Sequence, residues 1–380
     1  MNTTMVIRNA RMVLAGEVMD GSVSVRDGRI GSVDGGGCSV PEALDLGGDW
    51  LLPGLVELHT DNFEKHLMPR PKVRWPAFPA LLAHDAEVAA AGITTVYDAL
   101  GVGDSDLGAL RSQDPGEVLR ALQHATAQGL LRAEHRLHVR CELPAPNAVR
   151  LFEPFEHHPL LGLISLMDHT PGQRQWTNIE QARIYYTGKK GWSDEKFARA
   201  VVEAPQMQAQ HAAPNRERMV AFARERGVPL ATHDDTLLEH VEEAGRDGAA
   251  FSEFPTTVLA AAEAKKRGIA TIMGAPNVVR GGSHSGNVAA IDLARNRTLD
   301  VLSSDYVPAS LLPAALILQR DAGWTLPEAV ATVTRNPARA AGLADRGEIA
   351  VGQRADLVRM RMVDGHPVVL GVWRAGAKVN

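Results

Sequence analysis

The chain has 380 residues, of which 45% are hydrophobic and 22% charged, and its formal net charge is −5 at pH 7. This length suits one large domain with an appendage or two domains, and the composition is typical of an ordinary globular protein. The slight acidic excess argues against a surface that coats nucleic acid, but it leaves room for a local basic pocket.

Cysteine usage and hydropathy predict the compartment. Cys38 and Cys141 are too few for a disulfide framework or a thiolate zinc site, which favours a reducing environment. The first residues, MNTTMVIRNARMVLAG, lack the apolar segment of a signal peptide, and no run of 18 uncharged apolar residues predicts a membrane span. We therefore expect a cytoplasmic protein with no membrane or nucleic-acid partner.

Both ends of the chain predict short β-strands. Apolar and polar residues alternate at 5–14, 22–30 and 43–52, with glycine-containing turns between them, and a similar pattern returns at 347–363 and 365–380. The simplest interpretation is one small β-sandwich domain built from residues 1–53 together with residues 343–380. It would flank a large insert, residues 54–342.

The insert alternates short β-branched runs with longer helical stretches rich in Ala, Leu and Glu. Strands that alternate with helices predict parallel βαβ units, and eight units in this length favour a (β/α)8 barrel. A doubly wound open sheet is the alternative, which the absence of a Gly-x-Gly-x-x-Gly turn after an early strand weakens. The predicted strands are 51–61, 92–100, 135–143, 161–170, 228–235, 249–257, 269–277 and 300–306.

Titratable side chains lie at the ends of seven of these eight runs, among them Asp98 in the second, where such a barrel places its active site. His59 and Asp61 are two residues apart on a strand, so their side chains would share a face and could bind one metal ion. His233 could complete the site from across the barrel, and Asp305 could accept a proton from a metal-bound water. Each residue alone has an ordinary alternative; Asp234 and Asp235, for example, could cap the next helix.

Two motifs resemble the amidohydrolase superfamily. The segment LLPGLVELHTD is similar to that superfamily's first strand motif, and TRNPARAAGLADRGEIAVGQRADLVRM is similar to its C-terminal hallmark. The resemblance covers essentially the whole chain. It implies a metal-dependent hydrolase barrel with a β-sandwich built from both ends, and it suggests a homodimer.

This sequence departs from the usual dinuclear ligand set of that superfamily. Asp61 stands where a second histidine is usual, the fourth run has no lysine, and Glu253 stands where a histidine often follows the sixth strand. We expect a divalent metal, with Zn²⁺ as the first choice, as one ion or two, and Mn²⁺ or Fe²⁺ as alternatives. The candidate ligands are His59, Asp61, Glu142, His169, His233 and Asp305, of which His233 and Asp305 are also the candidate catalytic residues.

A narrower resemblance comes from ELHTDNFEKHLMPRP, THDDT, GAPNVVRGGSHSGN and SSDYVPASLL, which are similar to a diphosphatase subgroup of phosphonate catabolism, in the carbon–phosphorus lyase pathway. It implies hydrolysis of a ribose 5-triphosphate bearing a 1-methylphosphonate to the 5-phosphate and pyrophosphate. The partner would be a small phosphorylated sugar. A long loop at 171–193 and a Gly/Ser-rich turn at 279–287 could bind its phosphates. Candidate substrate-binding residues are Lys65, His66, Arg174, Lys189, Lys190, Arg280 and His284.

Two other functions remain open at this point. One is an amide or cyclic-imide hydrolase on the same barrel, similar to dihydroorotase or D-aminoacylase, which would need at most one small anion site. The other is a barrel without metal that serves as a scaffold. The joint presence of His59, Asp61, His233 and Asp305 argues against the scaffold.

Overall fold

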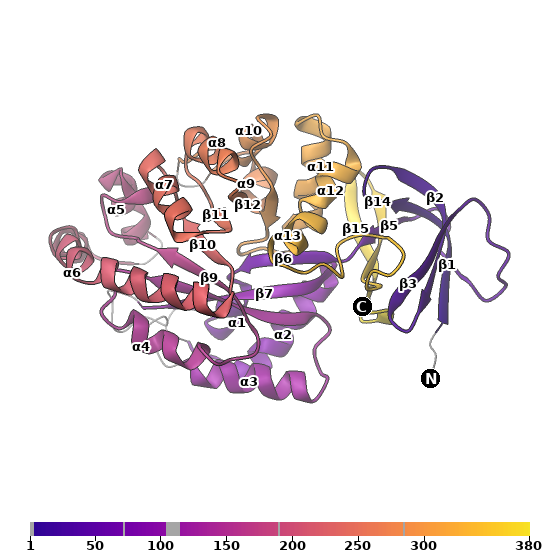
Figure 1. Cartoon of the computed structure of the whole chain (residues 1–380), viewed down its shortest axis with the longest axis horizontal. Coiled ribbons are helices and arrows are strands. Elements are labelled where there is room, and N and C mark those ends of the chain that lie inside the picture. The colour runs from indigo at the N-terminus through magenta and orange to yellow at the C-terminus, as the bar shows by residue number, and fades with distance from the viewer. Residues whose placement is uncertain (1–3, 71–72, 104–114, 189–190, 284–285) are drawn as a thin grey trace.

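The computed structural model describes residues 4–70, 73–103, 115–188, 191–283 and 286–380. Its centre is a ring of parallel strands in which each strand pairs with the next in chain order (Figure 1). Thr60 pairs with Asp305, which brings the last strand back beside the first. The predicted (β/α)8 barrel is confirmed. Its strands are β6 (Leu55–Thr60), β7 (Ile93–Val102), β8 (Glu134–Glu142), β9 (Leu161–Met167), β10 (Leu230–His233), β11 (Phe251–Glu253), β12 (Ala270–Gly274) and β13 (Val301–Ser303).

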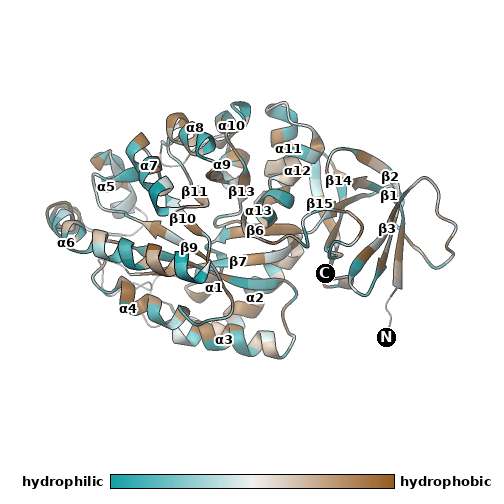
Figure 2. Ribbon diagram, in the orientation of Figure 1, coloured by the Kyte–Doolittle hydropathy of each residue, from teal (hydrophilic) through white to brown (hydrophobic). Residues whose placement is uncertain are grey.

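Helices cover the outside of this ring, and Figure 2 shows hydrophobic colour on the strands and mixed colour on the helices. The helix that ends at Arg226 and the one that ends at Asp247 are each followed by a glycine with left-handed φ, which is a common way to end a helix. The helices are α1 (Asn62–Leu67), α2 (Ala77–Ala90), α3 (Gly116–Ala127), α4 (Ala148–Phe152), α5 (Ile179–Gly188), α6 (Asp194–Arg226), α7 (Leu238–Asp247), α8 (Val258–Lys266), α9 (Ala275–Arg280), α10 (Ala290–Arg295), α11 (Leu311–Asp321), α12 (Leu326–Ala331) and α13 (Arg335–Ala340), with 3₁₀ turns η2 (Glu153–Phe155), η3 (Arg174–Trp176) and η4 (Pro308–Ser310).

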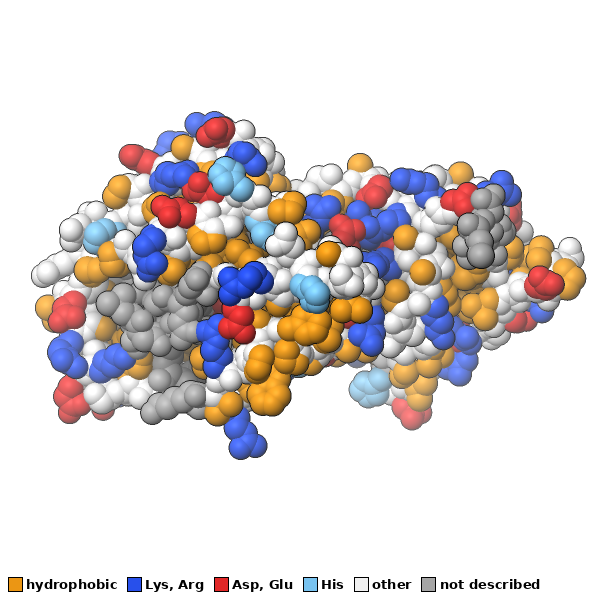
Figure 3. Space-filling view, turned by 90° about the horizontal axis from the view of Figure 1, so that it is seen from below, with side chains coloured by type: hydrophobic (Ala, Val, Ile, Leu, Met, Phe, Trp, Pro, Cys, Tyr) orange, Lys and Arg blue, Asp and Glu red, His pale blue; other side chains and the backbone are white. Residues whose placement is uncertain are grey.

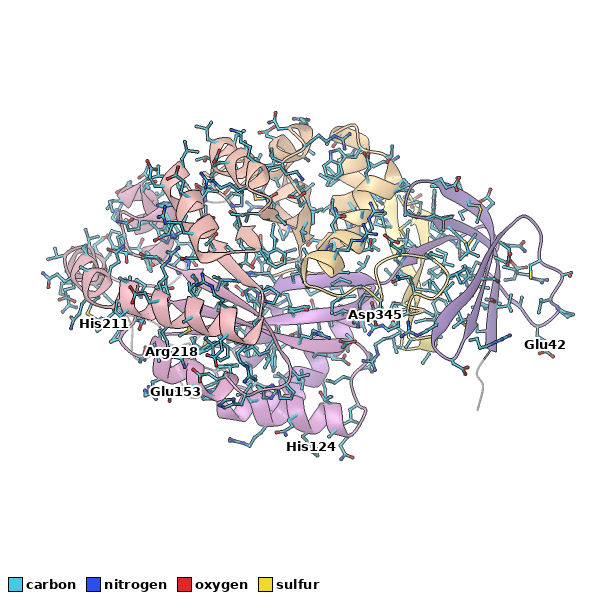
Figure 4. All side chains as sticks on the ribbon, in the orientation of Figure 1. Glu42, His124, Glu153, His211, Arg218 and Asp345 are labelled. Carbon is cyan, nitrogen blue, oxygen red and sulfur yellow. The ribbon has the colours of Figure 1, made fainter. Side chains whose placement is uncertain are left out.

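Strands from both ends of the chain form a second, mixed sheet beside the barrel, at the right of Figure 1. Their hydrogen bonds join them into one sheet, in which β5 from the N-terminal part lies between β1 and β14. Figure 4 shows Asp345 near the seam between this sheet and the barrel. The strands are β1 (Thr4–Val13), β2 (Val18–Arg26), β3 (Arg29–Gly35), β4 (Leu44–Asp45), β5 (Trp50–Pro53), β14 (Leu357–Val363), β15 (His366–Arg374) and β16 (Ala377–Lys378).

Gly54 separates the two sheets. The sequence predicts one strand at 51–61, but the structure has two, β5 in the terminal sheet and β6 in the barrel. A Cβ atom at residue 54 would clash with the side chain of Thr94 and lie 2.8 Å from Cβ of Asp356. Glycine is therefore required where the chain passes between the two sheets, and this crossing directs β6 toward the site.

The barrel and the terminal sheet share a hydrophobic core. Leu52, Val358 and Val372 of the terminal sheet pack in the same cluster as Ile93 and Leu293 of the barrel region. On the face shown in Figure 3, acidic and basic side chains are interspersed. Within the described residues, no helix has the length and apolar character that crossing a membrane requires.

Candidate active site

A cavity of about 280 Å³ opens at the carboxyl ends of the barrel strands. All six side chains that the sequence predicts as metal ligands line it, although they come from the ends of five strands, β6, β8, β9, β10 and β13, and the residues just after them. Parallel strands of a closed barrel end at one rim, so residues almost 250 positions apart in the chain meet there. These residues are His59, Asp61, Glu142, His169, His233 and Asp305.

Glu253, the last residue of β11, is fully buried and links two of the imidazoles. Its carboxylate oxygens lie 3.1 Å from Nδ1 of His59 and 3.3 Å from Nδ1 of His233. Each ring can donate its Nδ1–H to Glu253, and in that tautomer Nε2 carries the ring's ligating lone pair. A carboxylate that orients an imidazole in this way is the usual partner of a metal-binding histidine.

The charges of this group suit metal ligation. Burial lowers the pKa of His233 well below 6.5, and the nearby positive charge of Arg140 lowers it too, so the ring is neutral at pH 7. Burial acts to raise the pKa of Glu253, but His138 and the hydrogen bond from His233 keep it below its ordinary value. A neutral imidazole oriented by a charged carboxylate is the form that binds a divalent cation.

A second group lies beside the first. His169, His233 and Asp234 each offer a ligating atom within 4.8 Å of the others. Oδ2 of Asp234 is buried and has no hydrogen-bond partner in the described part of the chain, and burial raises the pKa of Asp234 to about 7. Glu142 orients His169, whose Nδ1 lies 2.5 Å from its carboxylate. A buried carboxylate oxygen without a partner, next to two imidazoles, fits a divalent metal.

The backbone is strained at three of these strand ends. Asp234, Phe254 and Asp305 all have left-handed φ values, between 53° and 57°, which residues with a Cβ seldom adopt. Such strain is concentrated at functional sites. The alternative in which Asp234 and Asp235 cap the next helix is not observed, because Leu237 is the N-cap of α7 and Asp235 accepts hydrogen bonds from within the barrel.

Asp305 is held where the barrel closes. Its backbone N–H donates to the carbonyl of His59 at 3.1 Å, and its carbonyl accepts from the N–H of Asp61 at 2.8 Å. Glu57 is buried where β13 meets β6 and accepts hydrogen bonds from the backbone N–H groups of His59 and Ser304. Burial raises the pKa of Glu57 to about 7. These contacts fix the position of Asp305 relative to the His59–Asp61 pair.

One residue expected at the rim lies elsewhere. Asp98 follows the second run of the sequence, but its side chain points out of the barrel toward α2. There it lies 2.7 Å from Nε2 of His84 and 2.8 Å from Nδ1 of His135. All three side chains are buried outside the cavity and form a structural network.

Among the predicted substrate-binding residues that the structure describes, only Arg280 lines the cavity wall. Lys65 and His66 lie on α1 and pair with Glu87 away from the wall. Arg174 is buried and supports the site from behind, where it donates to the carbonyl of His233 and to Asp235. Predictions that lie outside the described residues are those for Lys189, Lys190 and His284.

The stretch predicted as a long binding loop, 171–193, contains helices. η3 and α5 occupy most of its described part and pack on α6 through an aromatic cluster that includes Trp176, Tyr186 and Phe197. Trp176, Tyr185, Tyr186 and Trp192 also line the cavity. The described part of the predicted loop is therefore mainly a packed helical element beside the cavity.

The sequence of this chain is similar to those of known hydrolases. A sequence model of the Amidohydrolase family matches residues 85–376. The chain belongs to the amidohydrolase family. It is 48% identical over 377 residues, 99% of this chain and 100% of the relative, to the alpha-D-ribose 1-methylphosphonate 5-triphosphate diphosphatase of Escherichia coli K12. It is also 29% identical to the imidazolonepropionase of Methylobacterium nodulans, over 90% of this chain and 88% of that protein.

Solved structures of the same fold include a molinate hydrolase, with a TM-score of 0.68 and 14% identity over 99% of this chain and 94% of that one. At that identity the likeness shows the fold alone. Carboxylates and imidazoles at the strand ends are what we expect in the cavity of a member of the amidohydrolase family. Asp61 and Glu253, which differ from the superfamily's usual ligand set, both belong to this site. Asp61 lines the cavity, and Glu253 contacts His59.

Sequence reasoning missed two buried side chains of this amidohydrolase site. His138 and Arg140 lie on the inner face of β8, where His138 is 3.6 Å from Glu253 and Arg140 is 2.6 Å from Asp61. The signal was present, because residues 136, 138, 140 and 142 are all polar and alternate with apolar ones. Glu253 was noted as a departure, and its role as a link between two histidines emerges only from the structure.

Proposed function

We propose that this chain hydrolyses α-D-ribose 1-methylphosphonate 5-triphosphate to the 5-phosphate and pyrophosphate, as part of phosphonate catabolism. The observation that carries the proposal is the 48% identity, over nearly the full length of both chains, to the E. coli diphosphatase of that name. The cavity supports it, because a hydrolase of this family needs converging carboxylates and imidazoles at the barrel rim.

The residues that would hold the metal are those that converge on the cavity. We propose Zn²⁺, as one ion or two, with Mn²⁺ and Fe²⁺ as alternatives that also accept imidazole and carboxylate ligands. When bound, such an ion offers Lewis acidity toward phosphoryl oxygens and lowers the pKa of water. The ligands proposed from the sequence are His59, Asp61, Glu142, His169, His233 and Asp305, and the geometry adds Asp234 as a seventh candidate.

Asp305 is the proposed general base. It would take the proton from the attacking water while the new oxygen–phosphorus bond forms and the bond to the bridging oxygen of pyrophosphate breaks. His233 is the second proposed catalytic residue; its ring is neutral and is oriented by Glu253. Arg280 would form an ion pair with the negatively charged phosphate chain of the substrate. Roles for Lys189, Lys190 and His284 stay predictions, as do a homodimer and a cytoplasmic location.

The test is an assay that separates the products. The purified protein, supplied with Zn²⁺ or Mn²⁺, should release pyrophosphate from the ribose 5-triphosphate, and phosphorus NMR should show one 5-phosphate for each pyrophosphate. The same preparation is given dihydroorotate and imidazolonepropionate, because the likeness to imidazolonepropionases favours cyclic-amide hydrolysis as the second candidate. Faster turnover of either ring substrate than of the triphosphate would reject the proposed function.

A scaffold without metal is the remaining alternative. Metal analysis of protein purified without chelator addresses it, since a stoichiometry near zero together with no hydrolysis would favour the scaffold.

A further inference from the structure

Arg140 places a positive charge among the proposed metal ligands. It lies on β8 between His138 and Glu142, and these three side chains share the inner face of the barrel because alternate residues of a strand point the same way. The side chain of Arg140 is only 6% exposed, and it lines the cavity together with His59, His233 and Asp305.

The hydrogen bonds of this guanidinium are incomplete. Nη1 donates to Oδ1 of Asp61 at 2.6 Å. Nε is buried and has no partner among the described residues. A buried N–H group without a partner is unfavourable, so it normally signals a missing water or ligand. Arg140 is thus anchored on one side and keeps a donor for which no described residue supplies an acceptor.

The charged side chains of the cavity wall indicate which kind of ligand group the Nε–H of Arg140 would bind. Carboxylates of Asp61, Glu142, Asp234 and Asp305 line the cavity, while the described part of the wall supplies only two arginines as full cations. One is Arg280, which lies exposed in the last turn of α9. The other is Arg140, which is buried beside the proposed metal ligands. Without it, a polyanionic substrate there would face mainly carboxylates.

The geometry points to Arg140 as a direct contact of the phosphoryl group that is hydrolysed, and so as a residue that makes the site specific for phosphoanhydrides. This inference rests on the proposed function. A guanidinium presents a planar fork of donors that matches two phosphoryl oxygens, which an ammonium group does not. Asp61 anchors the guanidinium through Oδ1.

The inference is tested with Arg140→Met, which removes the charge and the fork but keeps a long side chain. The matched control is Arg346→Met, because Arg346 is equally buried and ion-paired, with Glu134 at 2.7 Å, but is not part of the cavity wall. Three quantities are compared in the metal-supplied proteins: kcat and KM for the triphosphate, metal content, and calorimetric affinity for ribose 5-(α,β-methylene)triphosphate, whose α–β bridge cannot be hydrolysed.

We expect Arg140→Met to keep its metal content, to bind the analogue at least 10-fold more weakly and to lose at least 100-fold in kcat/KM. Arg346→Met should bind the analogue as the wild type does. Arg140→Lys should recover part of the affinity for the analogue but little of kcat, because it restores the charge without the fork.

Unchanged affinity of Arg140→Met for the analogue would overturn the inference. So would a loss of bound metal that accounts for the whole effect, because Arg140 would then act only through Asp61. Failure of the proposed function looks different: the wild-type protein itself would release no pyrophosphate, whatever residue 140 is.

Discussion

Glu253 is the residue on which the two central imidazoles depend. Its carboxylate accepts from Nδ1 of both His59 and His233, and it lies 3.6 Å from Nε2 of His138. A fully buried carboxylate is stable only when such partners offset its loss of hydration. The same contacts hold both rings in one orientation, which is what a metal site requires of its ligands.

Glu253→Gln should therefore weaken metal binding while the fold persists. A glutamine amide can accept from one Nδ1–H, but its NH₂ group faces the other ring with a second donor. We expect a loss of about 10- to 100-fold in metal affinity, the range for removal of such a supporting partner. Titration of metal-free protein measures it. Glu263→Gln, on the outside of α8, is the matched control and should bind metal normally.

Asp305→Asn tests the proposed general base. Asparagine also tolerates left-handed φ, so the strained backbone at residue 305 can persist in the variant. General-base catalysis contributes about 10²- to 10⁴-fold, and we expect kcat to fall by at least that much with an unchanged circular dichroism spectrum. A variant that retains activity within tenfold of the wild type would show that another group takes the proton.

At the scale of elements, a buried ionic network attaches α2 to the barrel. Asp98 of β7 lies between His84 of α2 and His135 of β8, and His135 also contacts Asp85 of α2 at 3.3 Å. Burial acts to lower the pKa of His135, but Asp98 and Asp85 raise it to about 9. Burial acts to raise the pKa of Asp98, but the two histidines lower it to about 2.

This network predicts how stability depends on pH. The stabilisation from His135 is complete below its unfolded pKa of 6.5 and is lost as pH rises through about 9. The stabilisation from Asp98 is complete above 3.8 and is lost as pH falls through about 2. Urea unfolding between pH 4 and pH 10 should show the alkaline loss in the wild type.

His135→Gln should lower the free energy of unfolding at pH 6 and flatten its decline between pH 6.5 and 9. The control is His124→Gln, since His124 lies at the outer edge of α3 (Figure 4) and is exposed. Parallel pH profiles for His135→Gln and the wild type would contradict a charged His135 in the folded protein.

At the scale of the whole molecule, the division into two domains is a proposal: residues 1–53 with 343–380, and residues 54–342. The terminal sheet has a hydrophobic cluster of its own, which includes Ile7 and Trp373, but a second cluster joins Leu52, Val358 and Val372 to barrel residues. We therefore expect one cooperative thermal transition, with loss of barrel and terminal-sheet structure together. Two resolved transitions in calorimetry would mean that the parts unfold independently.

Metal removal should destabilise the folded chain as a whole. A ligand that binds only the folded state at 100 times its Kd adds about 2.7 kcal/mol, and without it the carboxylates around the cavity repel one another. Treatment with a chelator should lower the melting temperature by several degrees, and added Zn²⁺ should restore it. An unchanged melting temperature would count against a metal at this site.

The sequence by itself determined the alternation of barrel strands with helices, the joining of both chain ends in one sheet, and the strand-end positions of His59, Asp61, His233 and Asp305. Hydrophobic periodicity and turn residues are local properties, so they can be read along the chain. Only the tertiary structure decided that Asp98 faces outward, that Lys65 and His66 pair away from the cavity, and that Glu253 and Arg140 face into it. A strand's period of two shows which residues share a face, but the packing of neighbouring strands and helices determines which face is inside.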